Sequence, residues 1–141
     1  MAEIETNTEQ EKSLFIIEDD KPFRERLTTS FQRKDFSVTA AASKKEALDI
    51  LTNNDFNYAI VDLRLGDGSG LDVIKVIKEK NRSSVRVALS LSDSFCVERH
   101  FEAFRELTRD AVDIIFANED EMMMLTRTET VENMIEASKK L

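Results

Sequence analysis

Two short apolar runs, each followed directly by acidic residues, constrain the fold of this chain more than any other feature. The runs are Leu14–Ile17 and Tyr58–Val61, and the acids that follow them are Glu18, Asp19 and Asp62. Uninterrupted runs of this length, rich in Ile and Val, are typical of strands buried on both faces of a parallel sheet. Because ligands bind at the carboxyl ends of the strands in such sheets, we expect the three acids to converge at one edge.

Three carboxylates at one edge of a sheet repel one another. Such a cluster needs raised pKa values or a divalent cation bound through oxygen ligands. The sequence therefore predicts a Mg²⁺ site at the strand ends, beside a reactive carboxylate.

The remaining pattern alternates strands with helices along the whole chain. Asp20 is placed to cap a first helix that holds Pro22 in its first turn. Ser43 and Glu46 form a capping-box pattern before another helix. Five strands alternating with five helices predict the α/β class, with a doubly wound five-stranded parallel sheet. The predicted strands are 13–17, 36–40, 58–61, 85–89 and 112–116, and the aromatic residues expected in the core of the second half are Phe95, Phe101, Phe104 and Phe116.

Length, charge and cysteine content narrow the classes of function. The chain of 141 residues is predicted to hold an acidic, disordered lead-in (1–12), which is not a signal peptide, and one domain (13–141). The net charge of −8 disfavours direct binding to nucleic acid or acidic membranes, and no apolar stretch is long enough to span a bilayer. The single cysteine, Cys96, fits a reducing cytoplasm.

Three segments together resemble the receiver domain of two-component response regulators. They are Leu14–Asp20, Tyr58–Asp62 and Asp67–Asp72, and the run Val61–Asp72 is especially similar to regulators that end in a Fis-type helix-turn-helix. The resemblance is strong over 13–90 and weak afterwards. It implies a flavodoxin-like topology and a signalling domain that catalyses only its own phosphorylation and dephosphorylation.

The resemblance also implies roles for individual residues. Asp62 matches the phosphoacceptor, which attacks the phosphohistidine of a sensor histidine kinase or a phosphotransfer protein. Glu18 and Asp19 match the acids that hold Mg²⁺, with Asp62 and the backbone carbonyl of Arg64 completing the ligands. Ser90 matches the hydroxyl that senses the phosphoryl group. Homodimer formation is left open.

The second half departs from the family pattern. Receivers carry a lysine after their fifth strand, and here Ala117 or Asn118 takes its place. Ile114 stands where an aromatic switch residue is usual, and the stretch Leu91–Asp110 is longer than in the family. The acceptor half is therefore intact while the half that normally reads out phosphorylation is altered.

Other functions remain as alternatives to a phosphorylated receiver. The altered half is also consistent with a pseudo-receiver that binds partners without phosphorylation. A phosphatase of the haloacid dehalogenase type needs Asp-x-Asp after its first strand, which Glu18–Asp20 does not supply. Flavin binding is disfavoured because no phosphate-binding loop follows the first strand. Cys96 and His100 are spaced as two ligands on a helix, but helix packing explains them better, because no four-ligand zinc set exists from them alone.

Overall fold

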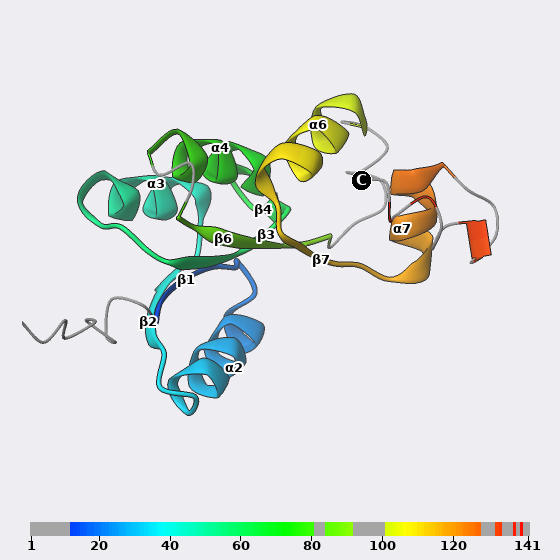
Figure 1. The fold of residues 1–141 in the computed structure, drawn as a ribbon. Helices are drawn as coiled ribbons and strands as arrows, with labels where there is room; N and C mark the ends of the chain where they lie inside the picture. The colour runs from blue at the N-terminus through cyan, green and yellow to red at the C-terminus, as the bar shows by residue number, and fades with distance from the viewer. Residues whose placement is uncertain are drawn as a thin grey trace, which may run out of the picture.

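A five-stranded parallel sheet forms the centre of the computed structural model, which describes residues 12–80, 84–91 and 101–127, with residues 132, 133, 137 and 139. The strand order is β2-β1-β3-β6-β7 (Figure 1). The chain places β2 on one side of β1 and then β3, β6 and β7 on the other, which is the doubly wound form that the sequence predicts. The five strands are β1 (Ser13–Ile17), β2 (Ser37–Ala41), β3 (Tyr58–Asp62), β6 (Arg86–Ser90) and β7 (Ile114–Phe116).

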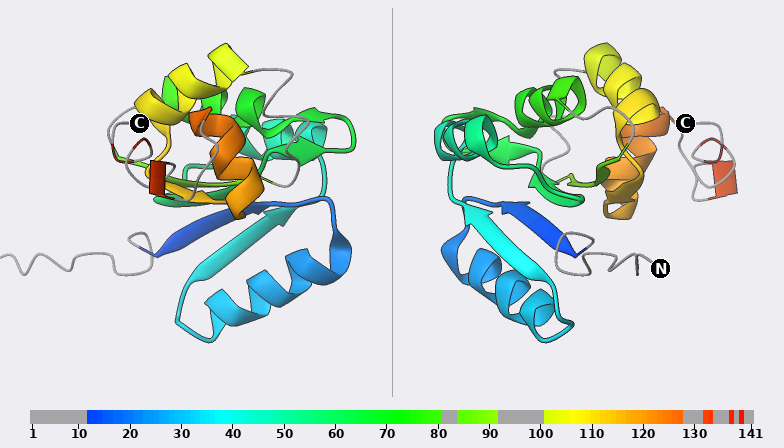
Figure 2. Two further views of the ribbon diagram at one scale, coloured as in Figure 1. Left: turned by 90° about the vertical axis from the view of Figure 1, so that its right-hand side faces the viewer. Right: turned by 60° about the vertical axis from the view of Figure 1, so that its left-hand side comes forward.

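The described helices cover the two faces of the sheet unequally. Helix α2 lies on one face, and α3, α4 and α6 lie on the other (Figures 1 and 2). The second face holds the main core, in which Phe15, Val61 and Ile74 are fully buried. The helix bounds are α2 (Lys21–Gln32), α3 (Lys44–Asn53), α4 (Gly70–Lys80), α6 (Phe101–Ala111) and α7 (Glu119–Thr126).

The helix starts agree with the polar signals in the sequence. The side chain of Asp20 accepts a hydrogen bond from the backbone N–H of Phe23 at 3.0 Å, so the predicted cap of α2 is confirmed. Ser43 caps α3 in the same way, at 3.1 Å from the N–H of Glu46. In the predicted capping box the Glu46 carboxylate would accept the N–H of Ser43. It accepts the N–H of Ala42 instead, at 2.8 Å.

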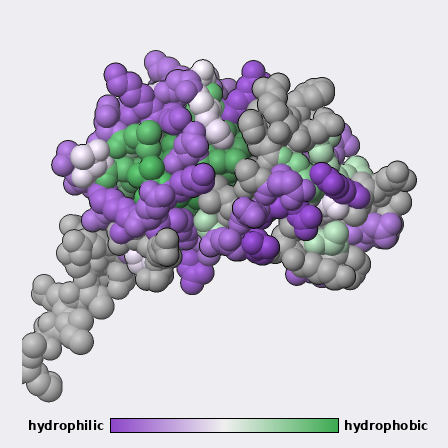
Figure 3. Space-filling model, turned by 90° about the horizontal axis from the view of Figure 1, so that it is seen from above, coloured by the Kyte–Doolittle hydropathy of each residue, from purple (hydrophilic) through white to green (hydrophobic). Residues whose placement is uncertain are grey.

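The helices are amphipathic, as their apolar periodicity predicts. Seen from above, the face that carries α3 and α4 is largely hydrophilic, with an apolar strip between polar borders (Figure 3). In α4 the inward positions Val73, Ile74 and Ile77 are buried, whereas Asp72 and Lys75 are exposed.

The fifth strand is shorter than predicted because Asp113 does not continue it. The Asp113 carboxylate accepts the N–H of Val87 at 2.8 Å, and the Asp113 N–H donates to the Val87 carbonyl at 2.9 Å. A side chain therefore takes the position that a backbone carbonyl would hold in a regular ladder. Regular strand structure begins only at Ile114.

The prediction that Phe116 lies in the core is wrong. Side chains alternate along β7, so Ile114 and Phe116 point to the face that carries α2 and are 53% and 55% exposed. They line a groove of about 370 Å³ together with Tyr58 and Phe36. Within the described residues, α2 is the helix on this face, and its main contacts are with β1 and β2. Phe101 is buried as predicted, while Phe95 and the side chain of Phe104 lie outside the described part of the chain.

Candidate functional site

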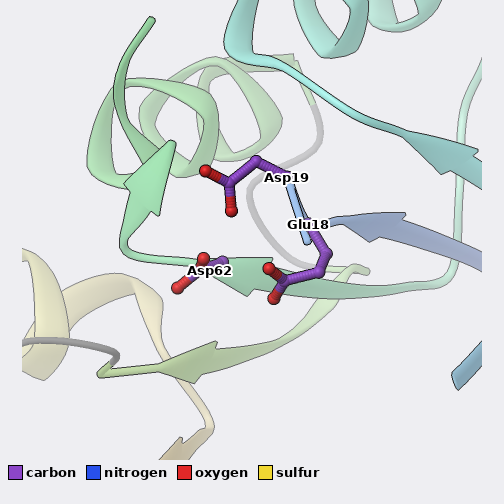
Figure 4. A group of neighbouring side chains, drawn as sticks. All are labelled: Glu18, Asp19 and Asp62. Carbon is purple, nitrogen blue, oxygen red and sulfur yellow. The ribbon is translucent and has the colours of Figure 1, made fainter. Parts of the chain in front are cut away.

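Three acidic side chains meet at the carboxyl ends of β1 and β3 (Figure 4). Glu18 and Asp19 follow the last residue of β1, and Asp62 is the last residue of β3. The parallel register pairs Ile17 with Val61, so the residues that follow lie next to each other. One carboxylate oxygen from each of the three acids lies within 4.8 Å of the other two. The convergence predicted from the sequence is therefore present.

Burial makes this cluster electrostatically costly. Glu18 is 6% exposed and Asp62 is 4% exposed, whereas Asp19 is exposed to solvent. The pKa of Glu18 is raised from its ordinary value of 4.5 to about 7. Burial is the largest cause, the hydrogen bond from the Asp20 N–H lowers the pKa, and the neighbouring charge of Asp62 raises it. Without a cation, Glu18 therefore gains and loses its proton near neutral pH.

The three acids fit a small, hard divalent cation. Mg²⁺ prefers oxygen ligands, keeps several waters and is usually held by one or two carboxylates. Two buried carboxylates beside an exposed one offer such a donor set with one open side. Burial is the largest cause of the raised pKa of Glu18, and a bound cation would lower that pKa by favouring the charged carboxylate. Glu18, Asp19 and Asp62 could therefore hold Mg²⁺.

Ser90 lies beside Asp62 across the sheet. The register of β3 and β6 pairs the two residues directly, and the N–H of Leu63 donates to the Ser90 carbonyl at 2.9 Å. Ser90 is half-buried at the end of β6. The structure thus places the predicted hydroxyl residue beside Asp62, while the roles of Asp62 as acceptor and of Ser90 in sensing a phosphoryl group stay predictions.

The loop after Asp62 is more regular than predicted, because it contains a small antiparallel hairpin of β4 (Arg64–Leu65) and β5 (Gly68–Ser69). Arg64 lies in β4, and its carbonyl stays a predicted ligand. The loop closes at Gly70, whose N–H donates to the Leu63 carbonyl at 2.8 Å. A Cβ at Gly70 would lie 2.1 Å from the Asp62 carbonyl oxygen, so only glycine fits beside the acceptor.

A second contact fastens this hairpin to the first turn of α3. The two carboxylate oxygens of Asp67 accept the N–H groups of Lys44 and Lys45 at 2.8 and 2.9 Å, and these bonds lower the pKa of Asp67. The ammonium of Lys44 pairs with Asp72 at 2.9 Å. The sequence pattern does not reveal this contact, because Lys44 and Lys45 lie more than twenty residues before Asp67.

The end of β7 carries no lysine. Phe116, the last residue of β7, pairs with Ser90, the last residue of β6. Ala117 is therefore the first residue after the carboxyl end of β7. Asn118 caps α7, accepting the N–H of Glu121 at 2.8 Å while the Glu121 carboxylate accepts the Asn118 N–H at 3.0 Å. Lys21 lies exposed on α2, 3.9 Å from Glu25.

Besides the contacts of Asp67 and Asp113, sequence reasoning missed contacts of Glu121 and Arg24 in the described region. Glu121 is buried, and the pattern Asn118-x-x-Glu121 is the capping-box signal that could have revealed its role. Arg24 donates from Nη1 to the carbonyl oxygens of Glu18 and Asp19, and no periodicity or motif signals such a contact. Cys96 and His100 lie outside the described residues.

The response regulator receiver domain family matches residues 14–128 of this chain. The chain therefore belongs to this family of two-component signalling domains, as the motifs predict. It is 37% identical over 90 residues to the photosynthetic apparatus regulatory protein RegA of Rhodovulum sulfidophilum, covering 64% of this chain and 49% of that protein. It is 38% identical over 80 residues to the acid tolerance regulatory protein ActR of Sinorhizobium medicae, covering 57% of this chain and 41% of that one. The chain thus spans about half the length of these relatives or less.

Solved structures show the same fold. The response regulator TrrA of Thermotoga maritima, in complex with Mg²⁺-BeF, has a TM-score of 0.60 at 21% identity, covering 92% of this chain and 97% of that one. The non-phosphorylated HemR receiver domain of Leptospira biflexa has a TM-score of 0.64 at 16% identity, covering 91% of each chain. Among the described residues, no helix has the length and apolar content needed to cross a bilayer.

Proposed function

We propose that Asp62 accepts a phosphoryl group, in a Mg²⁺-dependent reaction, from the phosphohistidine of a sensor histidine kinase or a phosphotransfer protein. The observation that carries this proposal is the buried Asp62 carboxylate at the end of β3, with oxygens of Glu18 and Asp19 within 4.8 Å. Such a cluster joins a nucleophilic carboxylate to ligands for the cation that phosphoryl transfer requires. Membership of the receiver family supports the same reading.

The residues present suit each part of the reaction. A carboxylate oxygen of Asp62 forms a bond to phosphorus while the bond from phosphorus to the imidazole nitrogen of the donor breaks. Glu18, Asp19, Asp62 and the Arg64 carbonyl would hold Mg²⁺, which supplies charge neutralisation at the phosphoryl oxygens. Ser90, paired with Asp62 in the register, would donate its hydroxyl hydrogen to one of those oxygens.

The wider role follows from this chemistry. The domain acts in the cytoplasm as a signalling element that turns over only its own phosphoryl group and relays the change through its surface. It binds proteins rather than nucleic acid, consistent with its net charge of −8. A second copy of the chain is one partner to test, because exposed apolar side chains line the groove beside β7.

Mass spectrometry after incubation with acetyl phosphate tests the proposal. The wild-type chain should gain the mass of one phosphoryl group with Mg²⁺ and none in EDTA, and Asp62→Asn should gain none. Asp20→Asn is the matched control, because it makes the same chemical change beside the cluster and asparagine caps a helix as well as aspartate. Label on Asp62→Asn would place the acceptor elsewhere.

One observation favours a second function, a pseudo-receiver that binds partners without phosphorylation. The residues after β7 are Ala117 and Asn118, and Asn118 is engaged in the cap of α7. A lysine there would pair with the acceptor in a standard receiver. A chain that takes no phosphoryl group from acetyl phosphate or from a competent kinase would have this second function.

A further inference from the structure

Arg24 connects helix α2 to the two residues that carry the first two acids. Its Nη1 lies 2.8 Å from the carbonyl oxygen of Glu18 and 3.3 Å from that of Asp19. The side chain is half-buried, and its own backbone N–H donates to the Asp20 carbonyl at 2.9 Å, inside the first turn of α2. One guanidinium therefore spans the turn between β1 and α2.

The turn that Arg24 spans sets where both carboxylates point. On its β2 side, the Glu18 N–H donates to the Ala41 carbonyl at 3.1 Å. At its α2 end, the Glu18 carboxylate accepts the N–H of Asp20 at 3.1 Å. A Glu18 carboxylate that binds a cation must give up or share its hydrogen bond with the Asp20 N–H. The hydrogen bonds from Arg24 go to backbone carbonyl oxygens, so they leave both carboxylates available to bind a cation.

We infer that Arg24 is a positioning residue for the divalent cation site. By holding two consecutive carbonyls, its guanidinium fixes the backbone from which Glu18 and Asp19 project. This inference rests on the proposed function, since it takes Mg²⁺ as the cation. Groups that do not touch the metal but orient its ligands through hydrogen bonds affect metal affinity, and their loss typically weakens metal binding 10- to 100-fold.

The direction in which Mg²⁺ affinity changes when Arg24 is replaced distinguishes a positioning role from an effect of its charge. Arg24 is positive, so its charge alone opposes a nearby Mg²⁺, and its removal would tighten metal binding. Its hydrogen bonds do the opposite, because they keep the ligands in a binding arrangement. A change of Arg24 that weakens Mg²⁺ binding therefore cannot come from charge, and it cannot come from a general loss of stability if the protein remains folded.

Calorimetric titration of the metal-free chain with Mg²⁺ tests this role. Arg24→Ala should weaken binding about tenfold or more. Arg26→Ala is the matched control, because it removes the same charge from an exposed position on the same helix, and its affinity should stay within about twofold of wild type. Arg24→Lys keeps the charge and one donor, so it should fall between Arg24→Ala and wild type.

Circular dichroism confirms that each variant is folded before its titration. If Arg24→Ala unfolds, the Mg²⁺ affinity of Arg24→Lys alone tests the positioning role. Wild-type affinity in Arg24→Lys and in a folded Arg24→Ala would overturn the positioning role while leaving the metal site in place. Tighter binding in Arg24→Ala would show that charge dominates and would overturn it too. A wild-type chain that binds no Mg²⁺ would overturn the proposed metal site, and the role of Arg24 with it.

Discussion

The side chains of the elements that surround the acidic cluster are much more deeply buried than the outward side chains of β7. Phe15 and Ile17 in β1 are fully buried, and the loop after Asp62 is fastened to α3 by Asp67. In β7, by contrast, Ile114 and Phe116 are more than half exposed. Asp62 ends β3, whose neighbours in the sheet are β1 and β6, and among the described strands β7 pairs only with β6. We therefore expect the backbone at Asp62 to tolerate changes in β7. A receiver can therefore keep its acceptor site while the adjoining region changes.

The largest expected contrast compares one phenylalanine from each region. Phe15 is fully buried and stacks on Phe56 with ring centroids 4.5 Å apart, so Phe15→Ala should lower the free energy of unfolding by about 4 kcal/mol. Phe116→Ala should lower it by less than about 1 kcal/mol, because most of that side chain already faces water. Urea denaturation measures both changes. Equal losses would show that Phe116 is covered in solution and would end the contrast between the two regions.

The pH dependence of stability tests the burial of the cluster. Glu18 has its pKa raised from 4.5 to about 7 in the folded protein. Below pH 4.5 both states hold this proton, and between 4.5 and 7 the unfolded chain releases it first. The free energy of unfolding in EDTA should therefore fall as pH rises through this window, by on the order of 2 kcal/mol, and then level off.

Glu18→Gln is the control for this pH dependence, since other groups titrate in the same range. The variant should lack the part of the fall that Glu18 causes, so the difference between the two stability curves reports this carboxyl alone. Asp62→Asn should reduce the fall without abolishing it, because burial is the larger cause of the shift. Parallel curves for wild type and Glu18→Gln would place Glu18 in water rather than in the cluster.

Mg²⁺ should stabilise the acceptor region through the same acids. At about ten times its Kd, the ion should raise the free energy of unfolding by about 1.4 kcal/mol. Asp19→Asn should lose most of this gain, because it removes an exposed ligand without opening a cavity. Thermal melting with and without the ion measures the effect, and Asp20→Asn should keep it. A melting temperature that ignores Mg²⁺ would exclude a working cation site.

The smallest expected effect concerns coupling to the second region. Phosphorylation at Asp62 should cause only small NMR shift changes across Phe95–Asn118, a coupling below about 1 kcal/mol, because the family's lysine is missing. Ala117→Lys should enlarge these changes, with Ala117→Gln as the uncharged control. Asn118 is the poorer position, because its side chain caps α7. A full rearrangement of that region in the native chain would show that the lysine is dispensable.

Local pattern predicted the first half of the fold well. The apolar runs before Glu18 and Asp62 determine two buried strands, and parallel pairing then brings the acids together. Asp20 and Ser43 revealed helix starts because capping is a contact within four residues. These features depend on neighbours in sequence, so one sequence is enough to find them.

The capping box of Asn118 and Glu121 was a local signal that was overlooked, whereas the other misses depend on the path of the folded chain. Phe116 looked like a core residue because its type is apolar, but its burial depends on which helix covers that side of β7. Asp113 shortened the last strand through a bond to Val87, 26 residues earlier. The role of Arg24 depends on the path of the turn before α2. No composition or spacing encodes these contacts, since each requires the chain to be folded first.

The double contact of Asp67 with α3 bears on the order in which the molecule folds. The first amides of a helix have no partner within the helix, and in α3 two of them find one only in a residue that follows β3. Before Asp67 reaches α3, water must accept these two amides, so the first turn of α3 lacks this stabilising contact. We therefore expect α3 and the loop after Asp62 to become fully stable together.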